Sequence, residues 1–484
     1  MRVQLLIPPF PRDARLGKTR ALYPVYPQLG ISYVAAEAER RGHQVEIIEA
    51  EVLFLDDTDC LEMIEDFKPR VLGFQVFTHS QDACHKLAGD AKQRIPGLVV
   101  VVGGIASTVQ PDYQLRPGNP VDYAVRGEGE QTFGELLEVL ELGLTGEALD
   151  QRLSQITGLS FRTSTGQVRH NPRRVEIDVM DDLPFPAFHL LPMGAYTAPA
   201  QLRGTAIHEM MMSRGCPYNC SFCMSPQSFK KRFRAFSVDR ILKDIAVMRE
   251  RYGMDSIQFY DDVFTYDRDH AMALLDAMID SGLDLPWTCL TRVDLVDQEL
   301  LHKMAKAGCY QIFYGMESAT QRILDLVHKG IKSLDQVRDA MKMTRKAGIE
   351  SFLSVMIGFP TETQAEAYDT MAFVRAVDPD YALWHRFTPW PGSAIYDLAM
   401  KHGKLRTDDL SKYTINWGFV YLPDGWTNEE LEKAERTAMR KFYLRPKKLM
   451  GKLKLLWTLP RERAWNLLKH GPDLLKTNPN AKTL

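Results

Sequence analysis

The first third of the chain alternates short apolar runs with amphipathic stretches. The apolar runs lie at residues 3–8, 44–50, 71–77, 98–104 and 122–130, and stretches such as 29–42 and 82–95 have the spacing of helices with one apolar face. Strands that alternate with helices are typical of a parallel sheet covered by helices on both faces. We therefore expect a doubly wound, Rossmann-like α/β domain at residues 1–145.

The loops that follow the strands are the candidate binding loops of such a domain, because ligands lie beyond the carboxyl ends of the strands. Gly103 and Gly104 directly follow the fourth apolar run. Two adjacent glycines would let the backbone approach a ligand closely, or would simply make a tight turn. The pair alone does not distinguish these interpretations.

A second alternation of apolar runs and helical stretches occupies residues 203–400. Its six apolar runs lie at 208–215, 256–262, 287–294, 311–318, 351–360 and 381–392. Six strand–helix units predict a partial TIM-type (β/α)6 barrel. The active site of such a barrel lies at the carboxyl ends of its strands.

The remaining segments, 146–202 and 401–484, have other patterns. Residues 146–202 are expected to form a connector that contains a two-stranded hairpin around Thr165 and Gly166. Residues 401–484 are expected to be helical and basic, since six Lys or Arg and no acidic residue lie between Lys441 and Lys454. That pattern is typical of the solvated face of a packed helix, or of an interfacial segment on anionic lipid.

Composition narrows the classes of function. The 484 residues carry 60 basic and 62 acidic side chains, a net charge of -2, which argues against a protein that coats nucleic acid. The N-terminal apolar run is too short for a signal peptide, and no segment has the roughly 18 uninterrupted apolar residues of a membrane span. These features predict a cytoplasmic protein, in which clustered cysteines bind metal or catalyse reactions more often than they form disulfides.

Three of the seven cysteines are crowded into eight positions as Cys216, Cys220 and Cys223. The other four, at positions 60, 84, 289 and 309, are scattered and are expected to be buried. A structural zinc site needs four ligands, but no second cysteine pair is present, and His208 lies eight residues before Cys216, a poor spacing for a ligand. Three thiolates can instead hold three irons of a 4Fe-4S cluster and leave the fourth iron open for another ligand.

The motif Cys-x3-Cys-x2-Cys after the first strand of the predicted barrel resembles the cluster motif of the radical S-adenosylmethionine (SAM) enzymes. In that family the open iron binds SAM, and one electron cleaves SAM to a 5′-deoxyadenosyl radical, so the resemblance implies both cofactors. Asp261 and Asp262 are adjacent on an extended chain, so only one of the two carboxylates is expected to face the cofactor. The implied SAM contacts are Phe222, Asp261, Asp262, Arg292, Glu317, Ser318, Gly358 and Pro360.

A doubly wound domain before the barrel, with RGEGEQTF at 126–133 and DDLPFPAFHLL at 181–191, resembles the cobalamin-binding subclass of these enzymes. Many such domains carry Asp-x-His-x-x-Gly after the first strand, and its imidazole ligates cobalt. Here Asp13 is followed by Arg15, and no histidine precedes His43, so bound cobalamin should lack a histidine lower ligand. The implied cobalamin contacts are Thr78, Ser80, Gly103, Gly104, Gly127 and Glu128.

The resemblance implies a methyltransferase that acts on an unactivated carbon. The alternatives are a cobalamin-dependent cyclase or rearrangement enzyme, a first domain that is only a docking module without a corrin, and a cluster that serves as an electron carrier or iron sensor. A flavodoxin or ferredoxin is the expected electron donor, and no nucleic-acid partner is expected.

Three aromatic residues around the sixth strand bear on the substrate. Trp384, Phe387 and Trp390 could line an apolar pocket or belong to the barrel core. Together with the basic C-terminal segment they favour a hydrophobic, lipid-like or polycyclic small-molecule substrate and peripheral contact with a membrane.

Overall fold

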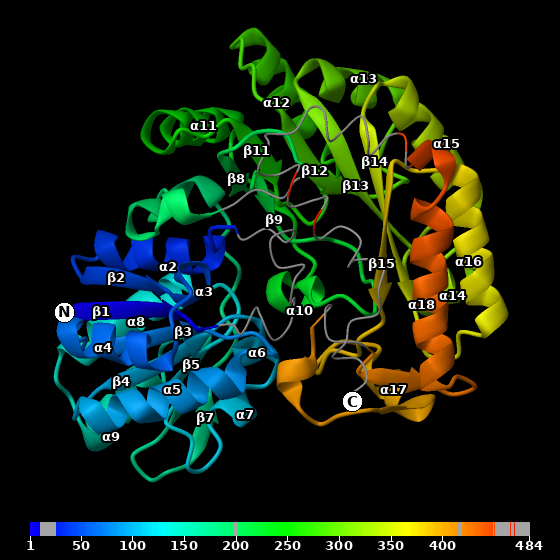
Figure 1. Cartoon of the computed structure of the whole chain (residues 1–484). Helices are drawn as coiled ribbons and strands as arrows, with labels where there is room; N and C mark the ends of the chain where they lie inside the picture. Colours follow the sequence, from blue (N-terminus) through cyan, green and yellow to red (C-terminus); the bar gives the residue numbers. More distant parts are fainter. Residues whose placement is uncertain are drawn as a thin grey trace. The chain divides into compact units, whose positions relative to one another are not determined.

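The computed structural model describes residues 1–9, 26–196, 202–414 and 419–448, together with Met450, Trp465 and Lys469. These residues form two compact units (Figure 1). Unit 1 contains the described residues of 1–9, 27–196 and 224–234, and unit 2 contains Tyr26, 202–223 and the described residues from 235 onward.

Unit 1 is built on a seven-stranded sheet with the order β2-β1-β3-β4-β5-β6-β7. Its first five strands are parallel and confirm the five predicted runs. The order 2-1-3-4-5 reverses between β1 and β3, and doubly wound sheets bind ligands at this kind of switch point. These strands are β1 (Arg2–Ile7), β2 (Gln44–Glu49), β3 (Val71–Gln75), β4 (Val99–Gly103) and β5 (Tyr123–Val125).

Helices cover both faces of this sheet, as a doubly wound domain requires. Leu6 and Leu72 belong to a buried cluster with residues of α4 (Asp57–Phe67) and α5 (Gln81–Arg94). On the other face, a Cβ at Gly73 would meet Leu5 and Phe133 of α8 (Glu130–Glu141), which packs against α2 (Leu29–Arg40). The shorter helices of this part are α3 (Ala50–Leu53), α6 (Ile105–Val109), α7 (Pro111–Gln114) and α9 (Gly146–Leu153).

The hairpin predicted around Thr165 and Gly166 is present as β6 (Leu159–Arg162) and β7 (Val168–His170). It also extends the sheet, because β6 pairs antiparallel with β5. The segment expected to be a connector therefore contributes two strands to the sheet of unit 1. The pattern of the hairpin alone cannot indicate this pairing, because it depends on the edge that β5 offers.

Residues 224–234, which directly follow Cys223, belong to unit 1. In this segment α10 (Ser225–Phe229) packs on α6, and Arg173 Nη2 donates a hydrogen bond of 2.5 Å to the carbonyl oxygen of Ser228. The segment was expected within the barrel. The structure places it instead with the first sheet, through contacts that lie far apart in sequence.

Unit 2 is built on a six-stranded parallel sheet with the order β15-β14-β13-β12-β11-β8. All six strands predicted for the barrel are present. Because β8 and β15 are the two ends of this order, the barrel is partial. The strands are β8 (Ile207–Met210), β11 (Ser256–Phe259), β12 (Trp287–Thr291), β13 (Cys309–Glu317), β14 (Glu350–Ile357) and β15 (Tyr381–Arg386).

The helices of unit 2 cover the outer face of its sheet (Figure 1). Along β14 every second residue is buried, and the residues between them are half-buried. The buried set faces the helices: Tyr314, which is paired in register with Leu353, exchanges a 2.8 Å hydrogen bond with Thr344 of α15. The opposite set faces the inside of the partial barrel. The helices are α11 (Val238–Tyr252), α12 (Arg268–Asp280), α13 (Gln298–Lys306), α14 (Gln321–Leu326), α15 (Leu334–Lys346) and α16 (Gln364–Val377).

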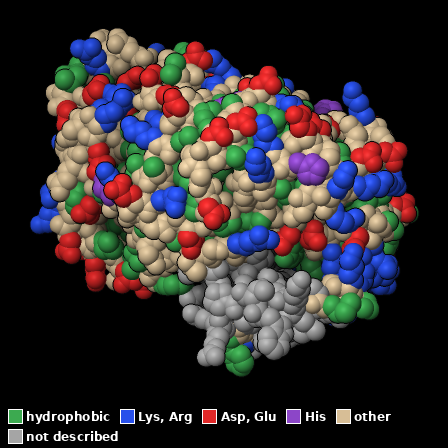
Figure 2. All heavy atoms as spheres, turned by 90° about the horizontal axis from the view of Figure 1, so that it is seen from above, with side chains coloured by type: hydrophobic (Ala, Val, Ile, Leu, Met, Phe, Trp, Pro, Cys, Tyr) green, Lys and Arg blue, Asp and Glu red, His purple; other side chains and the backbone are tan. Residues whose placement is uncertain are grey.

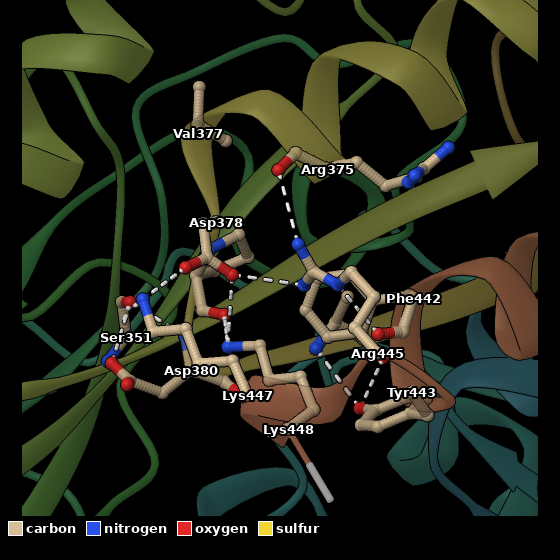
Figure 3. A network of polar contacts seen from close by, with 12 residues as sticks. Ser351, Arg375, Val377, Asp378, Asp380, Phe442, Tyr443, Arg445, Lys447 and Lys448 are labelled. Carbon is tan, nitrogen blue, oxygen red and sulfur yellow. Dashed lines mark hydrogen bonds and ion pairs between the residues drawn. The ribbon is translucent and has the colours of Figure 1, made fainter.

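The C-terminal part contains α17 (Tyr396–Lys401), the hairpin β16 (Gly403–Leu405) and β17 (Tyr421–Pro423), and α18 (Asn428–Tyr443). Much of the basic segment lies outside the described residues, so its predicted contact with lipid is not addressed there. Three of its described cations surround Asp378, at 2.9 Å for Arg445, 2.5 Å for Lys447 and 3.3 Å for Lys448 (Figure 3). These contacts support a packing role for the three cations.

The aromatic residues of the sixth strand divide between core and a more open position. Trp384 and Phe387 are buried, and Trp390 is half-buried with its ring 6.3 Å from that of Tyr413. Burial favours the core interpretation for the first two.

Charged side chains of both signs are interspersed over the described part of the face seen in Figure 2, in keeping with the net charge of -2. Among the described residues, the structure contains no helix with the length and apolar character needed to cross a membrane.

Candidate functional site

The cysteine loop follows β9 (Ser213–Arg214) directly. Cys216, Cys220 and Cys223 are partly buried and form no disulfide. The backbone N–H of Cys223 donates to the carbonyl oxygen of Cys220 at 3.1 Å, which makes a tight turn. Ser221 fixes the loop, because its N–H donates to Val327 and its carbonyl oxygen accepts from Ile395, each at 3.0 Å. The three thiols thus lie on a loop held by main-chain hydrogen bonds.

Opposing charges act on the thiol of Cys216. Burial raises the pKa of Cys216 to about 11; Asp262 adds to this effect, and Arg292 opposes it. Because thiolates are the ligands of iron, cations near the loop favour the form that binds.

Arg292 follows β12, at the position where the sequence predicts a guanidinium that holds a carboxylate. In the structure it holds Asp294, with Nε and Nη2 each 2.9 Å from a carboxylate oxygen. Its guanidinium carbon also lies 3.9 Å from the centre of the Tyr218 ring, within the cysteine loop. Arg292 is therefore a buried cation that is oriented from two sides.

Glu317 ends β13 and pairs with Lys329, whose Nζ lies 2.7 Å from Oε1. Both side chains are buried, and the backbone of Glu317 has a φ of 73°. A Cβ at Gly315 would lie 2.6 Å from Glu317 Oε1 and 2.8 Å from Lys329 Nζ, so only glycine leaves room for this pair. Although burial opposes it, the pKa of Lys329 is raised by Glu317 and by Cys220.

The adjacent carboxylates after β11 have different surroundings, as the alternation of an extended chain predicts. Asp261 is buried, and its oxygens accept hydrogen bonds from Ser213 Oγ and, at 3.3 Å, from Met212 N. Burial raises the pKa of Asp261 to about 7, while these hydrogen bonds act in the opposite direction. Asp262 is exposed and acts electrostatically on Cys216. Of the two carboxylates, Asp262 is the one that raises the pKa of Cys216.

The other implied SAM contacts lie at strand ends or in the cysteine loop. Phe222 lies edge-on to Phe359, with ring centres 6.3 Å apart. Gly358 has a φ of 91° and donates its N–H to Glu362 Oε2 at 2.7 Å, and Pro360 is buried. Ser318 is fully buried, and its Oγ accepts from Thr320 N at 3.1 Å, so this hydroxyl already serves the turn after β13.

The donor set fits a 4Fe-4S cluster. Among the described residues, no three Cys, His, Asp or Glu side chains are gathered closely enough to bind a single metal ion. A cluster differs from a single ion because each thiolate binds its own iron, so the thiols need not converge on one point. Three disulfide-free thiols on one fixed loop, with a buried arginine beside them, meet this requirement.

The implied cobalamin contacts gather at the carboxyl ends of β3, β4 and β5. Thr78 and Ser80 follow β3, and Ser80 Oγ accepts from Phe77 N at 3.0 Å. Gly104 has a φ of 97°, and a Cβ there would lie 2.9 Å from the carbonyl oxygen of Val76. This close approach of two loops accounts for Gly104 as a tight turn, whereas Gly103 has no such contact. Gly127 donates its N–H to Thr108 Oγ1 at 2.9 Å.

The carboxylate of Glu128 accepts hydrogen bonds from two residues of unit 1. Its Oε2 accepts from Arg234 Nη1 at 2.9 Å and from Ile177 N at 2.7 Å. Gln75, which ends β3, and Gln110, which follows α6, each have a buried Oε1 that lacks a hydrogen-bond partner in the structure. Such atoms fit the amide groups that surround a corrin, because these groups donate hydrogen bonds.

Sequence reasoning missed Asp294, Lys329 and Tyr218. The Arg-x-Asp spacing of Arg292 and Asp294 is a local signal that could have suggested the bidentate pair. The pairing of Lys329 with Glu317 bridges 12 positions and requires the fold to be known.

Comparisons with known proteins agree with this architecture. Residues 210–374 match the model of the Radical SAM superfamily, and residues 19–137 match that of the B12 binding domain. An uncharacterized methyltransferase of Pyrococcus horikoshii is 34% identical over 93% of this chain and 94% of its own length. The anaerobic magnesium-protoporphyrin IX monomethyl ester cyclase of Rubrivivax gelatinosus is 27% identical over 87% of this chain and 74% of its own length.

The fold is also that of a solved structure. The radical SAM methyltransferase TsrM from Kitasatospora setae, with cobalamin and a 4Fe-4S cluster bound, has a TM-score of 0.67 at 16% identity and covers 92% of this chain and 88% of its own. The two family models and the Pyrococcus relative, which matches nearly the whole length, establish the family. The chain belongs to the radical SAM enzymes that carry a B12-binding domain.

Proposed function

We propose that this enzyme methylates an unactivated carbon of a hydrophobic small molecule. The observation that carries the proposal is the loop of three cysteines, none in a disulfide, at the carboxyl ends of a partial barrel and beside the buried cation Arg292. The 34% identical relative named as a methyltransferase favours methyl transfer over other radical reactions.

In this proposal Cys216, Cys220 and Cys223 hold the cluster. When bound, the cluster supplies the electron that cleaves SAM, and cobalamin supplies the methyl group. The chain's own residues bind and orient these groups. Arg292, held by Asp294 and Tyr218, is a cation beside the cysteine loop. Lys329, held by Glu317, is a second cation that interacts electrostatically with Cys220.

SAM contacts are proposed for the groups that line the carboxyl ends of the strands. Asp262 is the better candidate of the two adjacent carboxylates, because Asp261 is directed to Ser213 and Met212. Ser318 supports the turn that carries Glu317. The remaining proposed contacts are Phe222, Arg292, Gly358 and Pro360.

Cobalamin contacts are proposed for the residues at the ends of β3, β4 and β5. Gly103 is the stronger glycine candidate, since packing against Val76 already explains Gly104. Glu128 supports this edge through Arg234 and Ile177. The loop after β1 contains no histidine, so cobalt is proposed to lack a histidine lower ligand.

Anaerobic reconstitution with iron, sulfide, reductant and SAM tests the cluster. We expect 5′-deoxyadenosine from the wild type and none from Cys220→Ala. Cys84→Ala is the matched control, because it removes a buried thiol of unit 1 that is not part of the motif and keeps all three ligands. Equal 5′-deoxyadenosine from wild type and Cys220→Ala would contradict the proposal.

A cyclase is the second candidate, favoured by the similarity to the Rubrivivax cyclase. SAM labelled in its methyl group separates the two reactions, since methyl transfer puts the label in the product and cyclisation does not. A corrin-free enzyme that remains fully active would contradict the use of cobalamin in either reaction.

Two partner proposals accompany this function. A flavodoxin or ferredoxin is proposed as electron donor. Arg445, Lys447 and Lys448 pair with Asp378. The other cations of the basic segment are proposed to contact anionic lipid. Equal sedimentation with liposomes of the full chain and of a chain that ends at Lys448 would remove the lipid proposal.

A further inference from the structure

The inward face of the unit 2 sheet carries a row of polar side chains. Strand register pairs Glu209 with Gln258, Gln258 with Thr288, Thr288 with Gln311, and Gln311 with Glu350. These five residues, one on each of five neighbouring strands, are here named the polar row. They alternate with the residues that face the outer helices, so their side chains point into the partial barrel.

The polar row contains unsatisfied hydrogen-bonding atoms. Gln258 Oε1, Thr288 Oγ1 and Gln311 Oε1 have no hydrogen-bond partner in the structure. Their side chains belong to residues that are only 7%, 1% and 0% exposed. Gln311 donates its amide N–H to Glu350 at 3.1 Å, so of its two polar side-chain atoms only Oε1 lacks a partner. Buried oxygens without a partner cost free energy, and three in one row indicate that a donor group belongs there.

Glu209 closes one end of the polar row as a neutral acid. It is 8% exposed, and burial raises its pKa to about 8. The hydroxyl groups of Tyr26 and Tyr260 interact electrostatically with it. A protonated carboxyl can donate as well as accept a hydrogen bond.

One step toward the carboxyl ends, the inward face becomes aromatic. Register pairs Phe313 with Phe352 and Phe352 with Tyr381. Their rings stack with centres 4.5 Å and 5.7 Å apart and with angles of 26° and 17° between the ring planes. All three are half-buried, so solvent reaches this stack, here named the aromatic wall.

The polar row and the aromatic wall together form a surface with two chemical parts. A flat apolar surface is matched by another flat apolar surface, and oxygen acceptors are matched by O–H or N–H groups. Water alone could satisfy the polar row, because buried waters commonly bridge such atoms. Water does not account for three stacked and half-exposed rings next to them.

We propose that the inward face of the partial barrel binds the substrate, with a planar apolar body against the aromatic wall and a hydroxyl or N–H group donated to the polar row. This inference rests on the proposed function and adds the class of substrate: a planar, largely apolar molecule with a hydrogen-bond donor at one end. It goes beyond the cofactor contacts, which lie at the strand ends.

The test uses two probes that share one ring body, 2-naphthol with an O–H donor and 2-methoxynaphthalene without one. Binding to the full chain without reductant is measured by saturation-transfer NMR titration. We expect 2-naphthol to bind roughly tenfold more tightly than the ether, and Thr288→Val to abolish this difference. Phe352→Leu should weaken both probes by similar factors.

Thr344→Val is the matched control, because it replaces a buried threonine on the helix-facing side and should keep the preference for 2-naphthol. Gln258→Met is a second variant of the polar row, in case Thr288→Val does not fold. Equal binding of the two probes to the wild type would overturn the inference, and so would an unchanged preference in a folded polar-row variant. Water alone would then satisfy the polar row. Loss of 5′-deoxyadenosine formation would instead contradict the proposed function, because probe binding needs no cluster.

Discussion

Charged side chains buried at the mouth of the partial barrel are paired within the protein. Lys329 binds Glu317 at 2.7 Å, and Arg292 binds Asp294 with two contacts of 2.9 Å. A lone buried charge is strongly destabilising, so these residues need their partners whether or not a cofactor is bound. The same pairs fix the side chains in advance, which is how a binding group keeps its orientation. Arg292 and Glu317 can therefore contact SAM only in addition to the partners they already have.

Glu209 gives the unfolding free energy a pH dependence that can be isolated. Its pKa is about 8 in the folded chain and 4.5 ordinarily, so between these values the folded state holds a proton that the unfolded state has lost. Stability therefore falls as pH rises from about 5 to about 8, with a slope of at most about 1.4 kcal/mol per pH unit. Urea denaturation across this range should show a shallower fall for Glu209→Gln than for the wild type.

The control for this experiment is Glu65→Gln, which removes an exposed carboxylate paired with Arg94. Its pH profile should follow that of the wild type. Identical slopes for the wild type and Glu209→Gln would show that Glu209 is ionised in the folded chain, which would contradict the neutral acid assigned to the polar row.

At the scale of elements, the cysteine loop depends on a neighbouring strand end for its chemistry. Burial and Asp262 hold the pKa of Cys216 high, at about 11, and Arg292 after β12 counters them. Ligation of iron requires the thiolate, so assembly of the cluster should accelerate as pH rises toward that value. The loop supplies the ligands, and β12 supplies the cation that makes one of them easier to deprotonate.

Arg292→Gln tests this division of roles. Removing the cation should raise the pKa of Cys216 further, so anaerobic cluster assembly, followed by absorbance of the iron-sulfur centre, should be slower at neutral pH and recover as pH is raised. Arg268→Gln is the control, because Arg268 also follows a barrel strand but pairs with Asp297 and Glu299 in an exposed position. Assembly that is slowed equally at every pH would point to a structural effect of Arg292.

The strands of both sheets could be predicted because their apolar runs are dictated by burial, which is visible in sequence. The two strands of the hairpin were also predictable, but their pairing with β5 was not, because antiparallel addition depends on an edge formed by distant residues. The same limit applies to the site. Cysteine spacing is a local signal, whereas the polar row appears only when the register of five strands is known.

At the scale of the whole molecule, the chain that leaves the cysteine loop returns to unit 1. Residues 224–234 belong to that unit, and Arg234 near the end of this segment pairs with Glu128 after β5, with both side chains 4% exposed. Residues 224–234, which follow the proposed iron ligand Cys223, are thus held by Glu128. Glu128 lies at the strand ends that are proposed to bind cobalamin.

A double-mutant cycle measures how strongly this buried pair holds the segment. Glu128→Gln removes the charge that pairs with the buried Arg234, and Arg234→Met removes the charge that pairs with the buried Glu128. Each change should lower the unfolding free energy by about 3–5 kcal/mol. The double variant removes both charges and should lose much less than the sum of the two. Arg232→Met, which breaks the exposed pair with Asp178, should cost less than about 1 kcal/mol because water solvates both groups. Additive losses in the cycle would mean that Glu128 and Arg234 stabilise the fold independently, and the segment would then have to be held by α10 and its contact with α6 instead.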